Sequence, residues 1–127
     1  MERQRITSGG AYEPIFGYCR AVRVGDHVYV AGTAPQMPEG ADPPADSYGQ
    51  AKRCFEIIGA ALAEAGSSFE DVVRTRLYLI DAGDYDGVAR AHGEIFSEIR
   101  PASTAIVVKA LLDPRWRIEI EADAVLP

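Results

Sequence analysis

Apolar and polar residues alternate along residues 72–80 and 117–126, which is the pattern of β-strands with one buried face. Strict alternation in the first of these places Val73 and Thr75 on one face and Val72 on the other. Three further segments are rich in β-branched and aromatic residues and are also predicted strands: residues 18–24, 27–33 and 104–111. Only two residues, Gly-Asp, separate the first two of these three, which predicts a β-hairpin.

Two other segments carry apolar residues three or four positions apart and are predicted amphipathic helices. In residues 46–65 the apolar stripe ends just before Gly66, which suits the position after a helix. Residues 85–99 form the second helix, and Asp84 is expected to cap its start. The stripe of the first helix consists of Ala51, Phe55, Ile58, Leu62 and Ala65.

The remaining segments are predicted connections. Residues 1–17 are expected to form an irregular N-terminal arm, and residues 35–46, with four prolines, a surface loop. The element order is then β-β-α-β-α-β-β. Because each helix has a single apolar stripe to bury, both should pack on one face of a mixed β-sheet. The chain is thus expected to be one α+β domain spanning residues 1–127.

The last strand divides its residues sharply between two faces. Alternate positions from Ile118 to Ala124 are apolar, whereas Glu119, Glu121 and Asp123 point the other way. The sheet face without helices should therefore carry acids, together with arginines and tyrosines from neighbouring strands. This face is either solvated, with ion pairs worth about 0–1 kcal/mol each, or covered by other subunits through arginine–carboxylate pairs.

Charge and composition limit the classes of partner that the chain is expected to bind. The 127 residues carry a net charge of −6 and no run of Lys or Arg, which disfavours nucleic-acid binding. No stretch reaches the roughly 18 apolar residues of a membrane span, and the N-terminal residues lack the apolar core of a signal peptide. A cytoplasmic protein is expected. His27 and His92 show no metal-ligand spacing. Cys19 and Cys54 are expected to be reduced thiols, with a disulfide or a nucleophilic cysteine as the alternatives.

Three stretches together resemble the Rid (reactive intermediate deaminase, RidA/YjgF) family, over about residues 17–126. The first stretch is the Tyr-containing hairpin, residues 18–25 with 28–33. The second comprises the end of the first helix and the start of the next strand, residues 65–66 with 71–75. The third comprises a Pro-Ala segment and a Glu-Ile-Glu-Ala segment, residues 100–103 with 118–122.

The resemblance implies a chorismate-mutase-like fold and a homotrimer whose sheets pack around a central axis. It also implies a small-molecule cleft between each pair of adjacent subunits. The typical family activity is hydrolysis of reactive enamines and imines, such as 2-aminoacrylate, to a 2-oxo acid and ammonia. No metal or organic cofactor is implied.

Candidate site residues follow from the same resemblance. Tyr18 and Glu119 match the family's cleft tyrosine and its water-positioning glutamate, and are the candidate catalytic residues. Ala31 and Gly32 match the segment that presents backbone amides to the ligand. For each of these residues a structural role is the alternative: packing on the sheet, an ion pair, or an ordinary strand end.

One position departs from the family pattern. Deaminating members hold the substrate carboxylate with an arginine, and Ser103 stands at that position here. A hydroxyl offers one donor and no charge. Arg20 is a candidate replacement, and Trp116 is a candidate cleft residue or an exposed contact with a neighbouring subunit.

Two functions remain open at this point. The first is cofactor-free hydrolysis of a reactive C–N compound at the trimer interface. The alternative is a non-catalytic metabolite-binding or regulatory trimer, which Ser103 favours. A ribonuclease is disfavoured by the net negative charge, and also because the two histidines show no arrangement as a catalytic pair.

Overall fold

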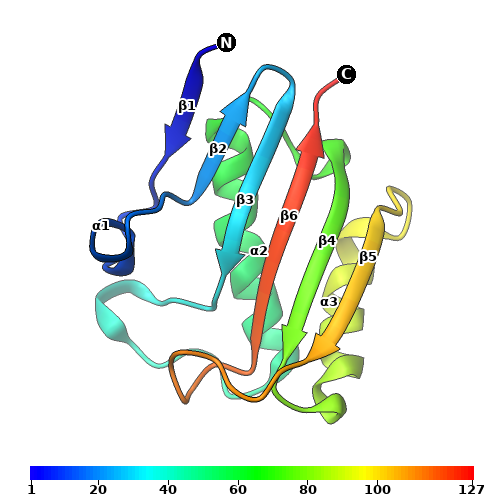
Figure 1. The fold of residues 1–127 in the computed structure, drawn as a ribbon. Helices are drawn as coiled ribbons and strands as arrows, with labels where there is room; N and C mark the ends of the chain where they lie inside the picture. Colours follow the sequence, from blue (N-terminus) through cyan, green and yellow to red (C-terminus); the bar gives the residue numbers. More distant parts are fainter.

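The computed structural model describes residues 1–127 as a mixed β-sheet with two long helices on one face (Figure 1). The elements in chain order are β1 (Arg3–Ile6), α1 (Tyr12–Phe16), β2 (Ala21–Val24), β3 (His27–Thr33), α2 (Ser47–Glu64), β4 (Val72–Leu79), α3 (Tyr85–Phe96), β5 (Ala102–Val107) and β6 (Ile118–Val125). Short 3-10 turns at Pro38–Gly40, Phe69–Asp71 and Ala82–Asp84 connect them. This is the α+β, chorismate-mutase-like fold that the sequence predicts.

The last strand of the chain lies in the middle of the sheet, whose order is β1-β2-β3-β6-β4-β5. Strand β6 is antiparallel to both β3 and β4, and β4 and β5 are parallel neighbours. A parallel pair needs a crossover connection, which α3 supplies. Figure 1 shows α2 and α3 side by side behind the sheet, as their single apolar stripes require.

The core lies between this helix layer and the sheet. All five predicted stripe residues of α2 are buried, from Ala51 to Ala65, and they pack against the apolar face of β6. Asp46 caps α2 by accepting a hydrogen bond from the Gly49 amide at 3.0 Å. Gly66 follows the helix with φ +82°, the left-handed conformation that terminates helices.

The prediction of an irregular N-terminal arm was wrong. Arg3–Ile6 forms the edge strand β1, antiparallel to β2, and Ile6 is buried in the core. The strand has three exposed residues before that one buried residue, so it shows no alternation in sequence. After it, the buried carboxylate of Glu13 accepts hydrogen bonds from Thr7 and Ser8 and holds the segment in place.

The alternation predicted for β4 fails at its first two residues. A β-bulge between Val72 and Arg74 inserts one extra residue into the pairing with β6. As a result Val72 is buried in the core, whereas Val73 is 48% exposed. Val72 therefore does not contribute an apolar side chain to the uncovered sheet face.

Asp84 does not cap α3 through its side chain, contrary to the prediction. Its buried carboxylate instead accepts a hydrogen bond from Arg117 Nε at 2.8 Å. The helix also ends three residues earlier than expected, at Phe96. Arg100 adopts a left-handed φ of +56° just beyond the helix, and Pro101 after it cannot continue a helix.

Candidate functional site

The sheet face that the helices leave uncovered carries the acids of β6, as predicted. Glu119, Glu121 and Asp123 alternate with four buried residues along the strand. Arg76 of β4 donates to Glu121 and Asp123, both at 3.3 Å. Tyr78 donates to Glu121 at 2.9 Å, and burial together with this bond raises the pKa of the tyrosine. The chain itself therefore neutralises part of this acidic face.

Glu119 stands apart from that ion-pair group. No hydrogen bond within the chain involves its carboxylate, which lies directly against Gly32 of β3. A Cβ at position 32 would fall 2.5 Å from Glu119 Oε2, so a larger residue there would displace the carboxylate from its present position. Burial raises the pKa of Glu119; the charge of Arg20 opposes this shift and that of Glu121 adds to it.

Gly32 lies against this carboxylate, Arg20 is near enough for its charge to act on it, and Tyr18 lies beside Arg20, just before β2. The Arg20 guanidinium lies over the Tyr18 ring at 5.4 Å, and its Nη2 donates to the Gly32 carbonyl at 3.1 Å. The pairing of β3 with β6 shifts between Val30 and Thr33, which is where these residues lie. The Ala31 amide donates to the Arg20 carbonyl, so it is already engaged.

Ser103 lies away from this group within a single chain. It is an exposed residue of the edge strand β5, paired with Thr75, and β4 separates it from β6. The Thr75 hydroxyl bonds both Ser103 Oγ, at 2.7 Å, and His92 Nε2, at 2.9 Å. His92 is thus a half-buried, hydrogen-bonded histidine, and burial lowers its pKa.

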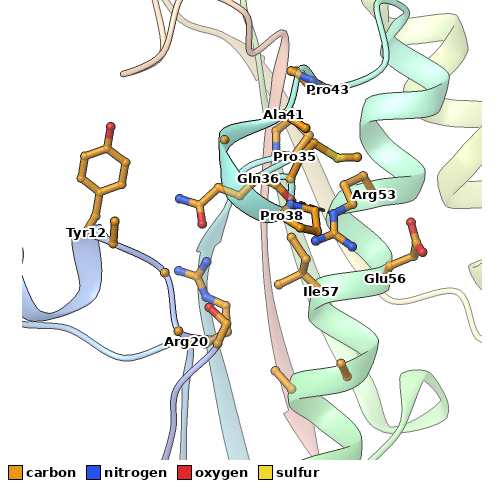
Figure 2. Close-up of a pocket in the computed structure, with 18 of the residues that line it drawn as sticks. Tyr12, Arg20, Pro35, Gln36, Pro38, Ala41, Pro43, Arg53, Glu56 and Ile57 are labelled. Carbon is orange, nitrogen blue, oxygen red and sulfur yellow. Dashed lines mark hydrogen bonds between the residues drawn. The ribbon is translucent and has the colours of Figure 1, made fainter.

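Trp116 is only 6% exposed, so the expectation of an exposed tryptophan at a subunit contact was wrong. It lines a cavity of about 790 Å³ enclosed by residues 6–12, by the loop after β3 and by α2. Figure 2 shows this cavity, with Tyr12 and Arg20 on its N-terminal side and Arg53 on α2. The cavity exists because the N-terminal segment is ordered, which the sequence did not reveal.

Two buried polar residues that the sequence analysis missed shape this region. Gln50 of α2 donates to the Arg115 carbonyl and accepts from the Arg117 amide, at 2.8 and 2.7 Å, which fixes the loop around Trp116. Glu13 orders the opposite wall. A glutamine within an amphipathic helix gives no sign of such a role, since most glutamines there face solvent.

The structure also bears on metal binding and on the reactivity of the cysteines. No group of three or more His, Cys, Asp or Glu side chains is arranged to hold a metal ion. Both cysteines are free thiols. Complete burial raises the pKa of Cys54 strongly, which leaves it a poor nucleophile. None of the helices combines the length and the apolar composition needed to span a bilayer.

A mixed six-stranded sheet, with two helices on one face and a row of acidic side chains on the other, defines a class of small α+β proteins. Comparisons with known proteins give the family. The family model described as Endoribonuclease L-PSP matches residues 9–126. The chain therefore belongs to this family, that of the YjgF, RutC and Rid proteins, which confirms the resemblance seen in the sequence.

Individual relatives agree along nearly the whole chain. The crystal structure of Rv2704 from Mycobacterium tuberculosis, a YjgF/YER057c/UK114 family member, has a TM-score of 0.90 at 38% identity, covering 98% of this chain and 100% of that one. An uncharacterized protein of Streptomyces coelicolor is 40% identical over 121 residues, 95% of this chain and 90% of its own length. TdcF of Escherichia coli, which carries the name of a reactive intermediate deaminase, is 30% identical over 98% of this chain and 95% of its own.

Proposed function

We propose that this protein is a cofactor-free hydrolase of reactive imines or enamines, acting in clefts between the subunits of a homotrimer. The observation that carries the proposal is Glu119: a partly buried carboxylate, free of hydrogen bonds within the chain, held against Gly32. Tyr18 lies beside Arg20, and its hydroxyl would help to position the substrate. The deaminase name of TdcF supports the reaction class.

Glu119 would handle protons in this reaction. Water adds to the carbon of the C=N bond while the carboxylate accepts one of its protons. Glu119 then passes that proton to the nitrogen, which gives a carbinolamine. In the second half of the cycle Glu119 moves the proton of the new hydroxyl to the amine, so that the C–N bond breaks as the C=O bond forms, and a carbonyl compound and ammonia leave. A carboxyl group whose pKa is raised by burial suits such a cycle, because both of its protonation states are accessible closer to neutral pH.

The substrate class follows from Ser103. A serine at the position of the family's carboxylate-binding arginine cannot form the bidentate pair that a guanidinium forms. Its Oγ accepts a hydrogen bond from Thr75, which leaves the serine one O–H to donate. We therefore propose imines without a carboxylate next to the reacting carbon as the preferred substrates.

Exposed apolar side chains support the homotrimer. Ile106 of β5 is 47% exposed, and its strand pairing places it beside Tyr78 on the uncovered face. Ile15 and Phe16 of α1 are more than 80% exposed. Apolar surface of this kind beside a polar group is typical of an interface. Assembly would also bring Ser103 of one subunit toward the Tyr18 and Glu119 of another, which a single chain does not do.

Ammonia release tests the proposal. Imines are generated in situ by an amine oxidase from primary amines, and by an amino-acid oxidase from amino acids for comparison. The protein should accelerate ammonia release from the carboxylate-free imines, and Glu119→Gln should reduce that rate at least about 100-fold. The matched variant Glu98→Gln, at an exposed position after α3, should retain it. Unchanged rates in Glu119→Gln would refute the mechanism.

A second function is a metabolite-binding trimer without catalysis, which the missing cation at Ser103 favours. Binding of imine-like carbonyl compounds, seen as a rise in Tm, with no acceleration of ammonia release from any imine, would establish it. A nucleic-acid substrate is not proposed, because the chain carries a net charge of −6.

A further inference from the structure

Arg20 is a buried cation without a counter-ion. Its side chain is only 2% exposed, yet no carboxylate of the chain lies within ion-pair distance of it. A guanidinium has five N–H donors, and this one makes a single hydrogen bond, to the Gly32 carbonyl. Its Nε is buried with no partner at all. Such a group is costly to bury unless something pairs with it.

The guanidinium lies at the wall of the 790 Å³ cavity, a volume within the range of small-molecule sites. In Figure 2, Arg20 projects into the space between Tyr12 and the Gln36 side chain. Polar residues such as Gln36 share the wall with apolar side chains, among them Ile6 from β1 and Ile57 and Ala60 from α2. The cavity thus offers a buried, unpaired cation and an apolar surface.

The other charged groups of the wall are either paired or exposed. Arg115 is engaged by Asp113 and Asp42, at 2.8 and 2.9 Å. Arg53 of α2 donates through Nε to the Gln36 carbonyl at 2.7 Å and is the second cation of the cavity. Glu56 and Glu64 lie on its exposed rim and would repel a multiply charged anion.

We propose that this cavity is a binding site for a small monocarboxylate with an apolar body. The carboxylate pairs with Arg20, and the apolar body lies along Ile6, Ile57 and Ala60. Arg53 adds a favourable field at the other side of the cavity. The cavity is distinct from the proposed catalytic cleft, because neither Tyr18 nor Glu119 lines it, and Arg20 lies between the two, with its guanidinium against the Tyr18 ring.

Calorimetric titration of the full chain with benzoate tests the site, with benzamide as the uncharged isostere. Benzoate is expected to bind at least about tenfold more tightly than benzamide, because only the carboxylate forms charge-assisted hydrogen bonds with Arg20. Arg20→Gln should weaken benzoate binding by about tenfold or more. Arg90→Gln, the same change at an exposed position of α3, should leave the affinity unchanged.

Two further variants make the test decisive. Ala60→Phe, at an exposed position of α2 on the cavity wall, should also weaken benzoate binding, and it does so without removing the buried charge. Tyr18→Phe should preserve benzoate affinity even where it abolishes ammonia release, which separates this site from the proposed function. Equal binding of benzoate and benzamide, no benzoate binding at all, or unchanged affinity in both Arg20→Gln and Ala60→Phe would overturn the proposal.

Discussion

Two side chains of opposite charge, Arg20 and Glu119, lie on either side of Gly32 without forming an ion pair. Arg20 donates to the Gly32 carbonyl, and Glu119 occupies the space where a Cβ would be. The charge of Arg20 lowers the pKa of Glu119, but burial outweighs it and the net shift is upward. The glutamate is thus partly desolvated without full compensation, which is a common state for catalytic carboxyl groups.

The incompletely compensated burial of Glu119 is expected to affect the free energy of unfolding. Because the pKa of Glu119 is raised on folding, the folded state binds its proton more tightly than the unfolded state does. Ionisation at neutral pH therefore costs folding free energy, and Glu119→Gln removes that cost. At fixed protein concentration the variant should have a Tm a few degrees above that of the wild-type protein at pH 7, for a gain of about 0.5–1 kcal/mol.

The sign of the effect depends on pH. As the pH falls below about 4.5, the ordinary value for a glutamate, wild-type Glu119 is protonated in both states and the difference in Tm should vanish. Thermal scans of both proteins between pH 4 and 8 measure this directly. A variant that is less stable than wild type at pH 7 would show that the carboxylate makes a stabilising contact instead. A gain in stability with a loss of activity would separate catalysis from folding.

At the scale of elements, two glycines of the helix layer are expected to respond in opposite directions. Gly66 follows α2 with φ +82°, and a Cβ there would lie 2.8 Å from Arg23 Nη1, which itself donates to the Ala65 carbonyl. Gly66→Ala should cost about 1–2 kcal/mol. Gly93 lies within α3 with no atom within 4 Å of a Cβ, so Gly93→Ala should stabilise by about 0.5–1 kcal/mol.

Urea unfolding of both variants at one protein concentration tests this pair. The comparison is informative because the substitution is identical and only the backbone conformation differs. A loss of stability in both variants would mean that the α3 position is packed more tightly than the structure shows. A gain in both would mean that residue 66 leaves the left-handed conformation at little cost.

The same elements show how far the sequence could lead. Long periodic segments were predicted well: α2 begins one residue after its capping Asp46, and β6 divides its residues between two faces as expected. The failures occur where pattern is absent or interrupted. The edge strand β1 has a single buried residue, and the bulge at Val73 changes the phase of β4 by one position. Neither feature leaves a trace in local periodicity.

The residues of the candidate site also divide into those that the sequence indicated and those that it did not. Gly32 and Glu119 were each named from the family motifs, but their direct contact was not, because it lies at the irregular part of the pairing between β3 and β6. The cavity of Trp116 and Arg20 could not be predicted, because its walls come from an N-terminal segment held by Glu13 and from a loop fixed by Gln50. These are single buried polar groups whose partners are distant or irregular in sequence. Their roles emerge only from the folded chain.

For the whole molecule, the proposed trimer determines whether the polar sheet face is sheltered. The face holds Arg76 and Tyr78 in bonds with β6, and beside them stands the exposed Ile106. If subunits cover this face, the protein should scatter light as a particle of three times the 13.7 kDa chain mass. Ile106→Lys would place a charge in that contact and should shift the particle toward the monomer mass at micromolar concentration.

Tyr85→Lys is the matched control, because Tyr85 is 53% exposed at the start of α3, in the layer opposite to the uncovered face. It should leave the particle mass unchanged. Ammonia release should fall together with the trimer in Ile106→Lys, because the neighbouring subunit that would form the other wall of the cleft, and hold the substrate against Glu119, is lost. A monomeric variant that keeps full activity would place the reaction within one chain, and a monomeric wild-type protein would remove the cleft from the mechanism altogether.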